Sequence, residues 1–192
     1  MNTDKFIIRD AAIDDATALL SIYSPYVEKT AVTFEYDVLS AEEFAQRIQT
    51  ISARYPYLVL VQNDSGNKVN DDKVVCNKKI VGYGYASTFK DRAAYDRCVE
   101  TSIYIRQGEH GKGFGRALYQ ELEKRLKNQG ILNSYACIAY AKPGNTHLDN
   151  GSFLFHQRMG YSLVGTFHDC GYKFGQWYDM VWMEKMLGNH EK

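Results

Sequence analysis

The sequence lacks an excess of charge of either sign, since 23 Lys and Arg residues face 23 Asp and Glu residues. This balance gives no reason to expect nucleic acid or an anionic membrane as a partner, because both attract basic proteins. The sequence also lacks an apolar run near the roughly 20 residues that span a bilayer, and its first residues do not resemble a signal peptide. Any anionic ligand must therefore be held by a local group of residues.

Cysteine is scarce and scattered, and none of the four cysteines has CxxC or CxxH spacing. A disulfide framework and a structural zinc site are therefore not expected, and we predict a cytoplasmic protein with reduced thiols and no metal. The sequence shows neither an internal repeat nor a linker, and its hydrophobic fraction of 45% can supply a sizeable core. We expect residues 1–192 to form one domain.

Hydrophobic periodicity predicts an alternation of strands and helices. Ser40 and Glu43 form a capping box at the start of one helix, and Pro25 is expected to interrupt or end the helix before it. The polar segment 63–79 is expected to be an exposed hairpin excursion. The order of elements favours an α/β (α+β) domain with a mixed sheet and helices on both faces. The predicted strands are 6–9, 57–61, 80–86, 98–105, 134–140, 161–167 and 177–184, and the helices are 14–23, 40–53, 117–127 and 152–159.

A glycine-rich turn lies between the strand 98–105 and the longest predicted helix. Gly111, Gly113 and Gly115 alternate with other residues, so the backbone can turn sharply and approach a ligand. The free amides at the start of a helix attract phosphate, and Lys112 and Arg116 add charge. The glycines could instead only shape the turn. Their spacing fits neither a P-loop nor a dinucleotide-binding motif.

Glu100 is a carboxylate in the middle of an apolar strand, which is costly unless the group is paired or useful. It could be a solvated residue on an edge strand, or it could form an ion pair with Arg92 or Arg97. Alternatively, a buried carboxylate with a raised pKa could take a proton from an amine before that amine attacks a thioester.

These motifs together resemble the GNAT superfamily of N-acetyltransferases, and the phosphinothricin acetyltransferase branch most closely. The branch has an Arg/Lys-x-x-Tyr segment and a Val-Glu-x-x-x-Tyr strand before a Gln/Arg-x-x-Gly-x-Gly/Ala loop, and the stretch from Arg92 to Gly115 follows that order. His110 stands where Gln or Arg is usual. The resemblance covers almost the whole chain apart from 63–79. It implies the GNAT fold, with a mostly antiparallel central sheet of about seven strands.

The resemblance also implies acetyl-CoA as cosubstrate, with Glu100 as the general base. The residues it assigns to coenzyme A binding are Ile103, Tyr104 and Ile105 on the strand and His110, Gly111, Lys112, Gly113, Phe114, Gly115 and Arg116 in the loop.

The stretch from Asp149 to Tyr161 resembles the family segment Asn-x-x-Ser-x-x-x-His/Tyr-Glu-x-x-Gly-Phe/Tyr. The family's pantetheine-binding Asn aligns with Asp149, so either Asn150 takes its place or the contact is lost. His156 aligns with a residue that protonates the departing thiolate, which makes it a candidate acid. A lone histidine on an apolar helix face can equally be a packing residue.

The resemblance implies that the acceptor is a small amino-acid-like amine, such as phosphinothricin, methionine sulfoximine or methionine sulfone. Arg92 and Tyr95 suit its anionic group, and Glu35 could bind an ammonium group or be solvated. Two alternatives stay open: acetylation of a polyamine, an aminoglycoside or a protein N-terminus, and a coenzyme-binding sensor without turnover. Relatives are often homodimers, and an aromatic C-terminal segment, 170–184, could supply that surface.

Overall fold

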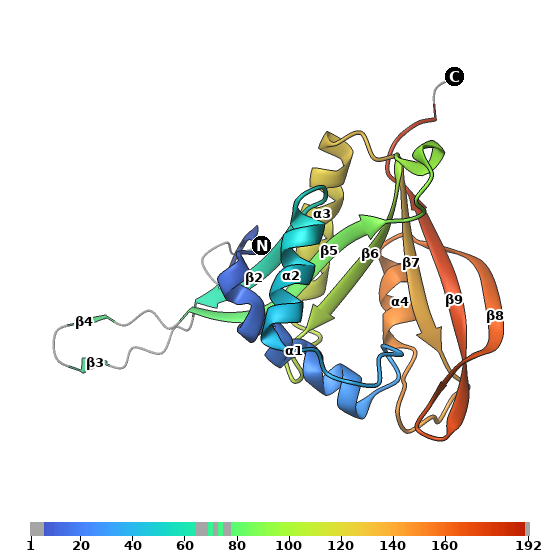
Figure 1. Cartoon of the computed structure of the whole chain (residues 1–192), viewed down its shortest axis with the longest axis horizontal. Coiled ribbons are helices and arrows are strands. Elements are labelled where there is room, and N and C mark those ends of the chain that lie inside the picture. Colours follow the sequence, from blue (N-terminus) through green and yellow to red (C-terminus); the bar gives the residue numbers. More distant parts are fainter. Residues whose placement is uncertain (1–5, 64–68, 71–72, 75–77, 191–192) are drawn as a thin grey trace.

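A computed structural model describes residues 6–63, 69–70, 73–74 and 78–190, which form the elements shown in Figure 1. Two short 3-10 turns, Ile13–Asp15 and Ala93–Tyr95, lie between them. The strands are β1 (Phe6–Asp10), β2 (Tyr57–Asn63), β3 (Val69–Asn70), β4 (Lys73–Val74), β5 (Lys78–Thr88), β6 (Cys98–Ile105), β7 (Asn133–Tyr140), β8 (Ser162–Lys173) and β9 (Gln176–Met186). The helices are α1 (Ala16–Lys29), α2 (Ala41–Ser52), α3 (Phe114–Asn128) and α4 (Gly151–Arg158).

Seven strands form one sheet in the order β1-β2-β5-β6-β7-β9-β8. Every neighbouring pair is antiparallel except β6 and β7, which are parallel. The prediction of a mixed, mostly antiparallel sheet of seven strands is confirmed.

The parallel pairing of β6 with β7 is short. It covers only the pairs Cys98–Asn133, Val99–Ser134 and Glu100–Tyr135. Beyond these pairs the two strands diverge, whereas β6 stays paired with β5 as far as Ile105 and β7 stays paired with β9 as far as Tyr140. We call this divergence the fork. It leaves one edge of each strand without a strand partner.

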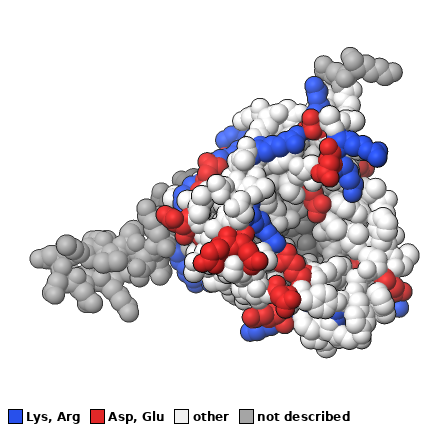
Figure 2. All heavy atoms as spheres, in the orientation of Figure 1, with Lys and Arg blue, Asp and Glu red and all other residues white. Residues whose placement is uncertain are grey.

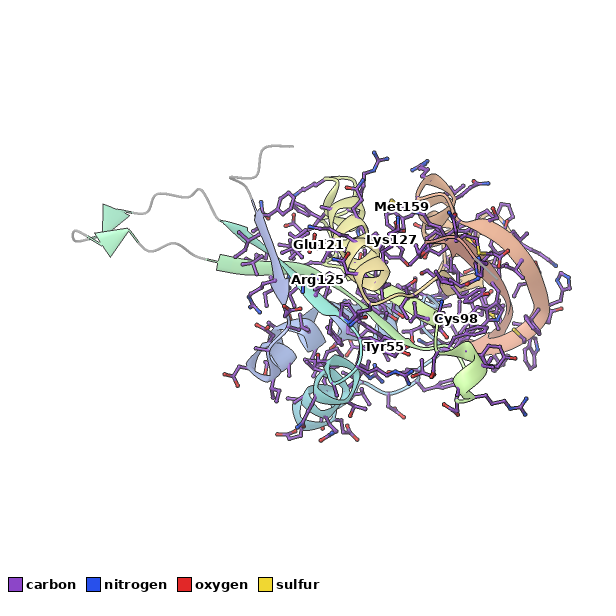
Figure 3. The ribbon with its side chains drawn as sticks, turned by 90° about the horizontal axis from the view of Figure 1, so that it is seen from above. Tyr55, Cys98, Glu121, Arg125, Lys127 and Met159 are labelled. Carbon is purple, nitrogen blue, oxygen red and sulfur yellow. The ribbon has the colours of Figure 1, made fainter. Side chains whose placement is uncertain are left out.

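Helices cover both faces of the sheet, as predicted, and Figure 3 shows α3 on one side with α1 and α2 on the other. The apolar stripe of α3 packs with β2, β5 and β6, and Leu118, Leu122 and Leu126 are almost completely buried. On the other face, Leu19 and Ile22 of α1 lie in one core with residues of α2 and of the sheet. Strand β6, one side of the fork, thus lies between two separate cores.

The capping box of α2 is confirmed, because Glu43 N donates to Ser40 Oγ at 3.1 Å and Ser40 N donates to Glu43 Oε2 at 2.8 Å. The expected effect of Pro25 is wrong, since α1 continues through it to Lys29. Proline removes one helical hydrogen bond. Burial of Tyr23, Tyr26 and Val27 on both sides of Pro25 outweighs that loss.

The last hairpin is longer than predicted. Strand β8 extends to Lys173 through two irregularities, between Leu163 and Gly165 and between Phe167 and Gly171. Such bulges break the alternation on which the sequence prediction depends. The predicted excursion 63–79 lies largely outside the described residues; of it, β3 and β4 form a two-stranded antiparallel ladder.

The described part of the chain contains no helix that is both long and apolar enough to cross a membrane. Figure 2 shows acidic and basic side chains mixed over one face of the molecule.

Candidate active site

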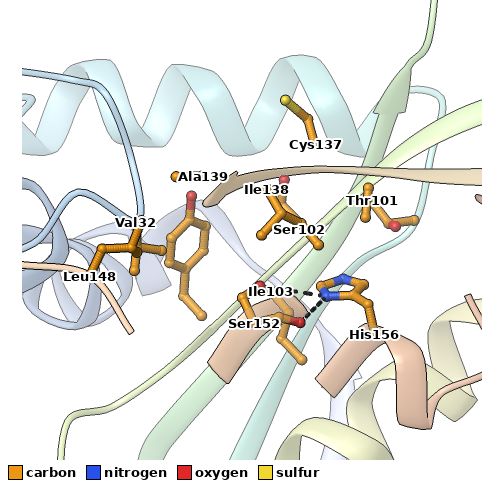
Figure 4. A pocket seen from close by; sticks show the side chains of 12 residues that line it. Val32, Thr101, Ser102, Ile103, Cys137, Ile138, Ala139, Leu148, Ser152 and His156 are labelled. Carbon is orange, nitrogen blue, oxygen red and sulfur yellow. Dashed lines mark hydrogen bonds between the residues drawn. The ribbon is translucent and has the colours of Figure 1, made fainter. Parts of the chain in front are cut away.

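A pocket passes through the sheet at the fork. Its lining includes Thr101 and Ile103, whose side chains point to the α3 and α4 face, and Ser102 and Tyr104, which point to the opposite face. Figure 4 shows the pocket between the diverging strands, with His156 on one wall. The lining from the β7 side and the helices is Ala136, Cys137, Ile138, Ala139, Val32, Leu148, Ser152 and His156. Two reactants could therefore meet in the fork from opposite faces of the sheet.

The edge of β6 that faces the fork offers main-chain groups to a ligand. Amide groups alternate between the two edges of a strand, and Arg106 N donates to Val81 O of β5. The N–H and C=O of Ile103 and Ile105 therefore point toward the fork. Ile105 O already accepts a hydrogen bond from Tyr26 OH, whereas Tyr104 directs its main chain to β5 and its ring into a tyrosine cluster with Tyr23 and Tyr26.

The glycine-rich loop ends at a helix start that no side chain caps. Gly113 is the N-cap of α3 with φ of 85°, and Gly111 has φ of 77°, a left-handed conformation that favours glycine. The first amides of α3, from Phe114 to Arg116, have no partners within the helix and suit an anion such as a pyrophosphate. The Phe114 ring itself is buried against Phe6, so only its main chain can contribute.

The charged groups near this loop are partly engaged. Lys112 Nζ donates to Glu109 Oε2 at 2.6 Å, while Arg116 is exposed. His110 Nε2 lies 2.9 Å from Tyr26 OH. Because the Tyr26 hydroxyl donates its single proton to Ile105 O, His110 Nε2 must donate to Tyr26. His110 is thus tied to α1 and to the end of β6.

Glu100 lies half-buried on the face opposite α3, next to Ser102 of the pocket wall. Burial raises the pKa of the Glu100 carboxyl, and the positive charge of Lys90 partly opposes this rise. Among the residues that the structure describes, neither Arg92 nor Arg97 forms an ion pair with it. The carboxylate therefore has the raised pKa expected of a proton acceptor.

His156 lies on the other face, where it is only 3% exposed. Its Nδ1 is 2.8 Å from Ser152 O and its Nε2 is 2.7 Å from Tyr119 OH. Burial lowers the pKa of the His156 ring to about 4, although the hydrogen bond with the Ser152 carbonyl raises it somewhat. The ring is therefore neutral at pH 7, and the acid role remains a prediction.

Tyr119 connects His156 to a group of buried hydroxyls. Tyr119 OH lies 3.0 Å from Thr101 Oγ1, which lies 3.3 Å from Ser134 Oγ and 3.0 Å from Tyr135 O. Ser134 Oγ lies 2.6 Å from Tyr161 OH. We call the side chains of Thr101, Tyr119, Ser134, His156 and Tyr161 the fork network. Ser134 and Tyr135 belong to the last residue pairs before the strands diverge.

Asn150 is bound to the end of β7. Its Oδ1 accepts from Ala141 N at 3.2 Å and its Nδ2 donates to Ala141 O at 2.9 Å. Asp149 Oδ1 accepts from Gly151 N at 2.9 Å. Binding of pantetheine through the Asn150 side chain, as predicted, would require these two bonds to be exchanged.

Of the predicted acceptor residues, Glu35 is held from the protein side. Arg47 Nη2 donates to Glu35 Oε1 at 2.7 Å, while Glu35 Oε2 is buried without a partner among the described residues. Tyr85 lies close enough to feel the charges of both Glu35 and Glu100. Burial raises the pKa of its hydroxyl, and these two negative charges raise it further. A hydrogen bond with Ser102 and the positive charge of Arg47 lower it.

Arg92 and Tyr95 lie in the exposed turn between β5 and β6. The Tyr95 ring packs edge-on against Phe89 at 5.9 Å, and Phe89 stacks on Tyr135 at 4.4 Å. Arg92 and Tyr95 could therefore contact a ligand only at the solvent-exposed mouth of the site, next to this turn.

Two important residues escaped the sequence reasoning. Tyr119 reads as part of the apolar stripe of α3, and only its hydroxyl distinguishes it. Lys173 is 3% exposed and its Nζ donates to the carbonyls of Val27, Thr30 and Thr33 at 2.8, 3.0 and 2.8 Å. It fixes the loop after α1 that carries Val32 and Glu35. Lys173 lies in a Gly-x-Lys-x-Gly segment, residues 171–175, and the carbonyls that it binds lie far away in the sequence.

The comparisons with known proteins agree with this geometry. The model of the acetyltransferase (GNAT) domain matches residues 8–182. The chain belongs to the GNAT acetyltransferase family. The predicted resemblance, fold and acetyl-CoA dependence are confirmed by this match and by the relatives.

Two curated relatives and one solved structure illustrate the branch. Phosphinothricin N-acetyltransferase of Streptomyces coelicolor is 29% identical over 94% of this chain and 95% of its own. The L-methionine sulfoximine/L-methionine sulfone acetyltransferase of Pseudomonas paraeruginosa is 30% identical over 94% of each chain. The structure of a phosphinothricin acetyltransferase from Sinorhizobium meliloti with acetyl-CoA has a TM-score of 0.80 and 33% identity, covering 96% of this chain and 89% of that one.

The residues of this GNAT enzyme fit acetyl-CoA. The uncapped start of α3 suits the pyrophosphate, the fork-facing edge of β6 suits the amides of pantetheine, and the pocket admits an acetyl group between the strands. Acetyl-CoA supplies the activated acetyl group as a thioester.

Proposed function

We propose that this enzyme transfers the acetyl group of acetyl-CoA directly to the primary amine of a small amino-acid-like acceptor of the phosphinothricin, methionine sulfoximine or methionine sulfone type. The observation that carries the proposal is the pocket at the fork, lined by His156 on one face of the sheet and by Ser102, two residues after Glu100 on the same strand, on the other. The names of the relatives support the class of acceptor.

Glu100 is proposed as the general base. Its burial-raised pKa makes the carboxylate a better proton acceptor than an ordinary glutamate. An acceptor that binds over Ser102 and Tyr85, on the same face of the sheet as Glu100, would bring its ammonium group to Glu100, directly or through one water. Loss of that proton frees the amine lone pair to attack the thioester carbon in the fork.

The coenzyme is proposed to lie on the α3 and α4 side. The Ile103 N–H faces the fork and would donate a hydrogen bond to the thioester oxygen, where negative charge develops. The amides of residues 114–116, with Lys112 and Arg116, would hold the pyrophosphate, and His110 would flank it. His156 and Ser152 form the wall next to the leaving thiolate.

The acceptor is proposed to use both charged groups at the outer side of the pocket. The unpartnered Glu35 Oε2 lacks a hydrogen-bond donor, and a buried acceptor oxygen without one is unfavourable. An ammonium or imino group of the acceptor would supply the donor. Arg92, with Tyr95, would bind the anionic end of the acceptor at the mouth.

The test is release of free coenzyme A from acetyl-CoA with a panel of amines. The panel contains methionine sulfone, methionine sulfoximine, phosphinothricin, the common L-amino acids, spermidine and an aminoglycoside, each with the wild type and with Glu100→Gln. The expected result is that the wild type releases coenzyme A with methionine sulfone, methionine sulfoximine or phosphinothricin, and that Glu100→Gln does not. Release with spermidine or the aminoglycoside alone would contradict the acceptor assignment. Binding of acetyl-CoA without any release would favour the sensor.

The proposal includes a homodimer and a cytoplasmic location. Strand β8 is an edge of the sheet, and it exposes large apolar side chains together with β9, which is typical of an association surface. The exposed residues are Leu163, Val164, Phe167, Tyr172, Trp177 and Met186.

The cytoplasmic location agrees with the state of the cysteines. Cys98, Cys137 and Cys170 are free thiols, as expected in a reducing compartment. Fractionation of cells tests the location.

A further inference from the structure

Both ring nitrogens of His156 are engaged inside the protein. Nδ1 faces the main-chain oxygen of Ser152, which can only accept a hydrogen bond, so Nδ1 carries the proton of the neutral ring. Nε2 must then accept, and the Tyr119 hydroxyl must donate to it at 2.7 Å. The hydrogen-bond partners thus select one tautomer of His156.

The same reasoning fixes the direction of the hydrogen bonds in the fork network. Besides the longer contact of His156 Nδ1 with Ser152 Oγ at 3.5 Å, its six hydrogen-bonded pairs are His156 with Ser152 O, His156 with Tyr119, Tyr119 with Thr101, Thr101 with Ser134, Thr101 with Tyr135 O, and Ser134 with Tyr161. Each pair needs one proton, and the neutral network holds five, one on each side chain. Since Tyr119 donates to His156, the Thr101 hydroxyl must choose between Tyr119 and Tyr135 O.

The surroundings favour the neutral state over a sixth proton. The His156 ring is enclosed by the rings of Tyr119, Phe155 and Tyr161, with centroids 5.2, 5.2 and 5.3 Å away. The nearest acidic side chain of α3 on this face is Glu123, and Lys185 already pairs with it at 2.7 Å. Among the described residues, no carboxylate forms an ion pair with the His156 ring that would stabilise an imidazolium.

We propose that Tyr119 and Thr101 are positioning residues, which hold His156 as a neutral ring with its proton on Nδ1 and fix it to the apex of the fork. This inference rests on the proposed acetyl transfer. In this role His156 shapes the thiol side of the pocket and orients Ser152, and it does not give a proton to the leaving thiolate. Thr101 is the residue after Glu100, so the network also ties the two faces of the site together.

The decisive pair of variants is Tyr119→Phe and Tyr161→Phe. Each removes one buried hydroxyl from the fork network, but of these two hydroxyls only that of Tyr119 forms a hydrogen bond with His156. Nitrogen-15 NMR of labelled histidine, with His156→Gln used to assign the signal, should show a protonated Nδ1 and a bare, hydrogen-bonded Nε2 at pH 7. Tyr119→Phe should change the Nε2 signal and lower kcat/KM roughly 10-fold, the effect of one lost hydrogen bond. Tyr161→Phe should leave the Nε2 signal unchanged and should lower kcat/KM less than Tyr119→Phe does, because the Tyr161 hydroxyl bonds to Ser134 and not to His156.

The proposal is overturned if Nε2 carries the proton at pH 7, or if both phenylalanine variants behave alike. Should Tyr119→Phe fail to fold, Thr101→Val takes its place, because it removes the hydroxyl that bonds to Tyr119 in the fork network. The tautomer is read without turnover, so a wrong acceptor assignment would leave the NMR result intact.

A second comparison separates positioning from acid catalysis. In His156→Gln the side-chain amide keeps one donor and one acceptor, whereas His156→Ala keeps neither. The positioning role predicts that the glutamine variant retains roughly 10-fold more activity than the alanine variant. An equal loss of activity in both variants, together with an alkaline fall of kcat in the wild type, would show that the imidazolium is the acid.

Discussion

At the scale of single residues, Glu100 makes the sharpest prediction. Glu100→Gln should lower kcat/KM by roughly 100- to 10,000-fold, the usual contribution of a general base. Because burial raises the pKa of Glu100, the acid limb of the wild-type profile should lie above the value of about 4.3 for an ordinary glutamate. Glu100→Asp should retain a limb of the same sense. A pH-independent wild-type rate down to pH 4 would contradict this role.

Glu100→Gln should lower activity but should not lower the stability of the fold. A carboxyl whose pKa is higher in the folded state stabilises the protein only while it is protonated, so its unfavourable charge appears as the pH rises. Glu100→Gln should therefore unfold at the same or a higher temperature than the wild type at pH 8, and the difference should vanish near pH 4. Thermal unfolding at both pH values provides the measurement.

His156 should make the protein sensitive to mild acid. Its folded pKa of about 4 lies below the ordinary 6.5, so its stabilising contribution is complete above pH 6.5 and is lost as the pH falls toward 4. The gap corresponds to about 3 kcal/mol. Urea unfolding between pH 7 and 4 should show a smaller loss of stability for His156→Gln than for the wild type. Parallel losses would argue against a buried neutral ring.

The buried ammonium group of Lys173 stabilises the loop after α1 through three hydrogen bonds. Lys173→Met should destabilise the protein by roughly 2–4 kcal/mol, since three carbonyls lose a charged donor, and it should raise KM for the acceptor because the loop carries Val32 and Glu35. The control is the exposed Lys127→Met, which should change stability by less than about 0.5 kcal/mol. Unfolding curves and acceptor KM values distinguish the two variants.

The sequence revealed some of these residues and concealed others for physical reasons. The half-buried position of Glu100 could be predicted because a charge interrupts an otherwise apolar strand, and its role as a base stays a prediction. Tyr119 could not, because its ring satisfies the apolar stripe of α3 and only a distant histidine gives its hydroxyl a purpose. The binding roles of Glu35, Arg92 and Asn150 stay predictions, although the bonds of Asn150 to Ala141 and of Glu35 to Arg47 are now visible.

At the scale of elements, α3 carries a left-handed glycine at each end. Gly113 has φ of 85° and Gly130 has φ of 80°, and a Cβ at either position would meet nothing within 4 Å. Alanine should therefore cost about 1–2 kcal/mol at both positions, for backbone reasons alone. Only Gly113→Ala should also raise KM for acetyl-CoA, because only that end faces the proposed pyrophosphate site. Equal KM values in the two variants would remove the loop from the coenzyme site.

Elements with a local signal were predicted well, and those shaped by tertiary contacts were not. The box of Ser40 and Glu43 and the left-handed Gly160 after α4, with φ of 89°, are decided within a few residues. Helix α1 passes Pro25 because of side chains it buries elsewhere, and β8 owes its length to bulges and to pairing with β9. The fork itself has no sequence signal, because nothing in β6 or β7 specifies where they separate.

At the scale of the whole molecule, the exposed apolar edge predicts association. A Leu163→Lys, Trp177→Glu double variant should sediment as a monomer at micromolar concentration, where the wild type sediments as a dimer, since charges at both positions oppose burial. The control is Ile13→Lys, at an exposed residue remote from β8. A monomeric wild type would end the dimer proposal and leave the site unaffected.

The short pairing between β6 and β7 also has a consequence for the order in which the chain folds during synthesis. Strands β1, β2, β5 and β6 are antiparallel neighbours drawn from the first 105 residues, so they can pair while the rest of the chain is still being synthesised. The glycine-rich loop follows them directly, but a cleft exists only once β7 has docked along three residues of β6. A nascent chain thus completes its glycine-rich loop before it has a cleft in which a thioester could lie.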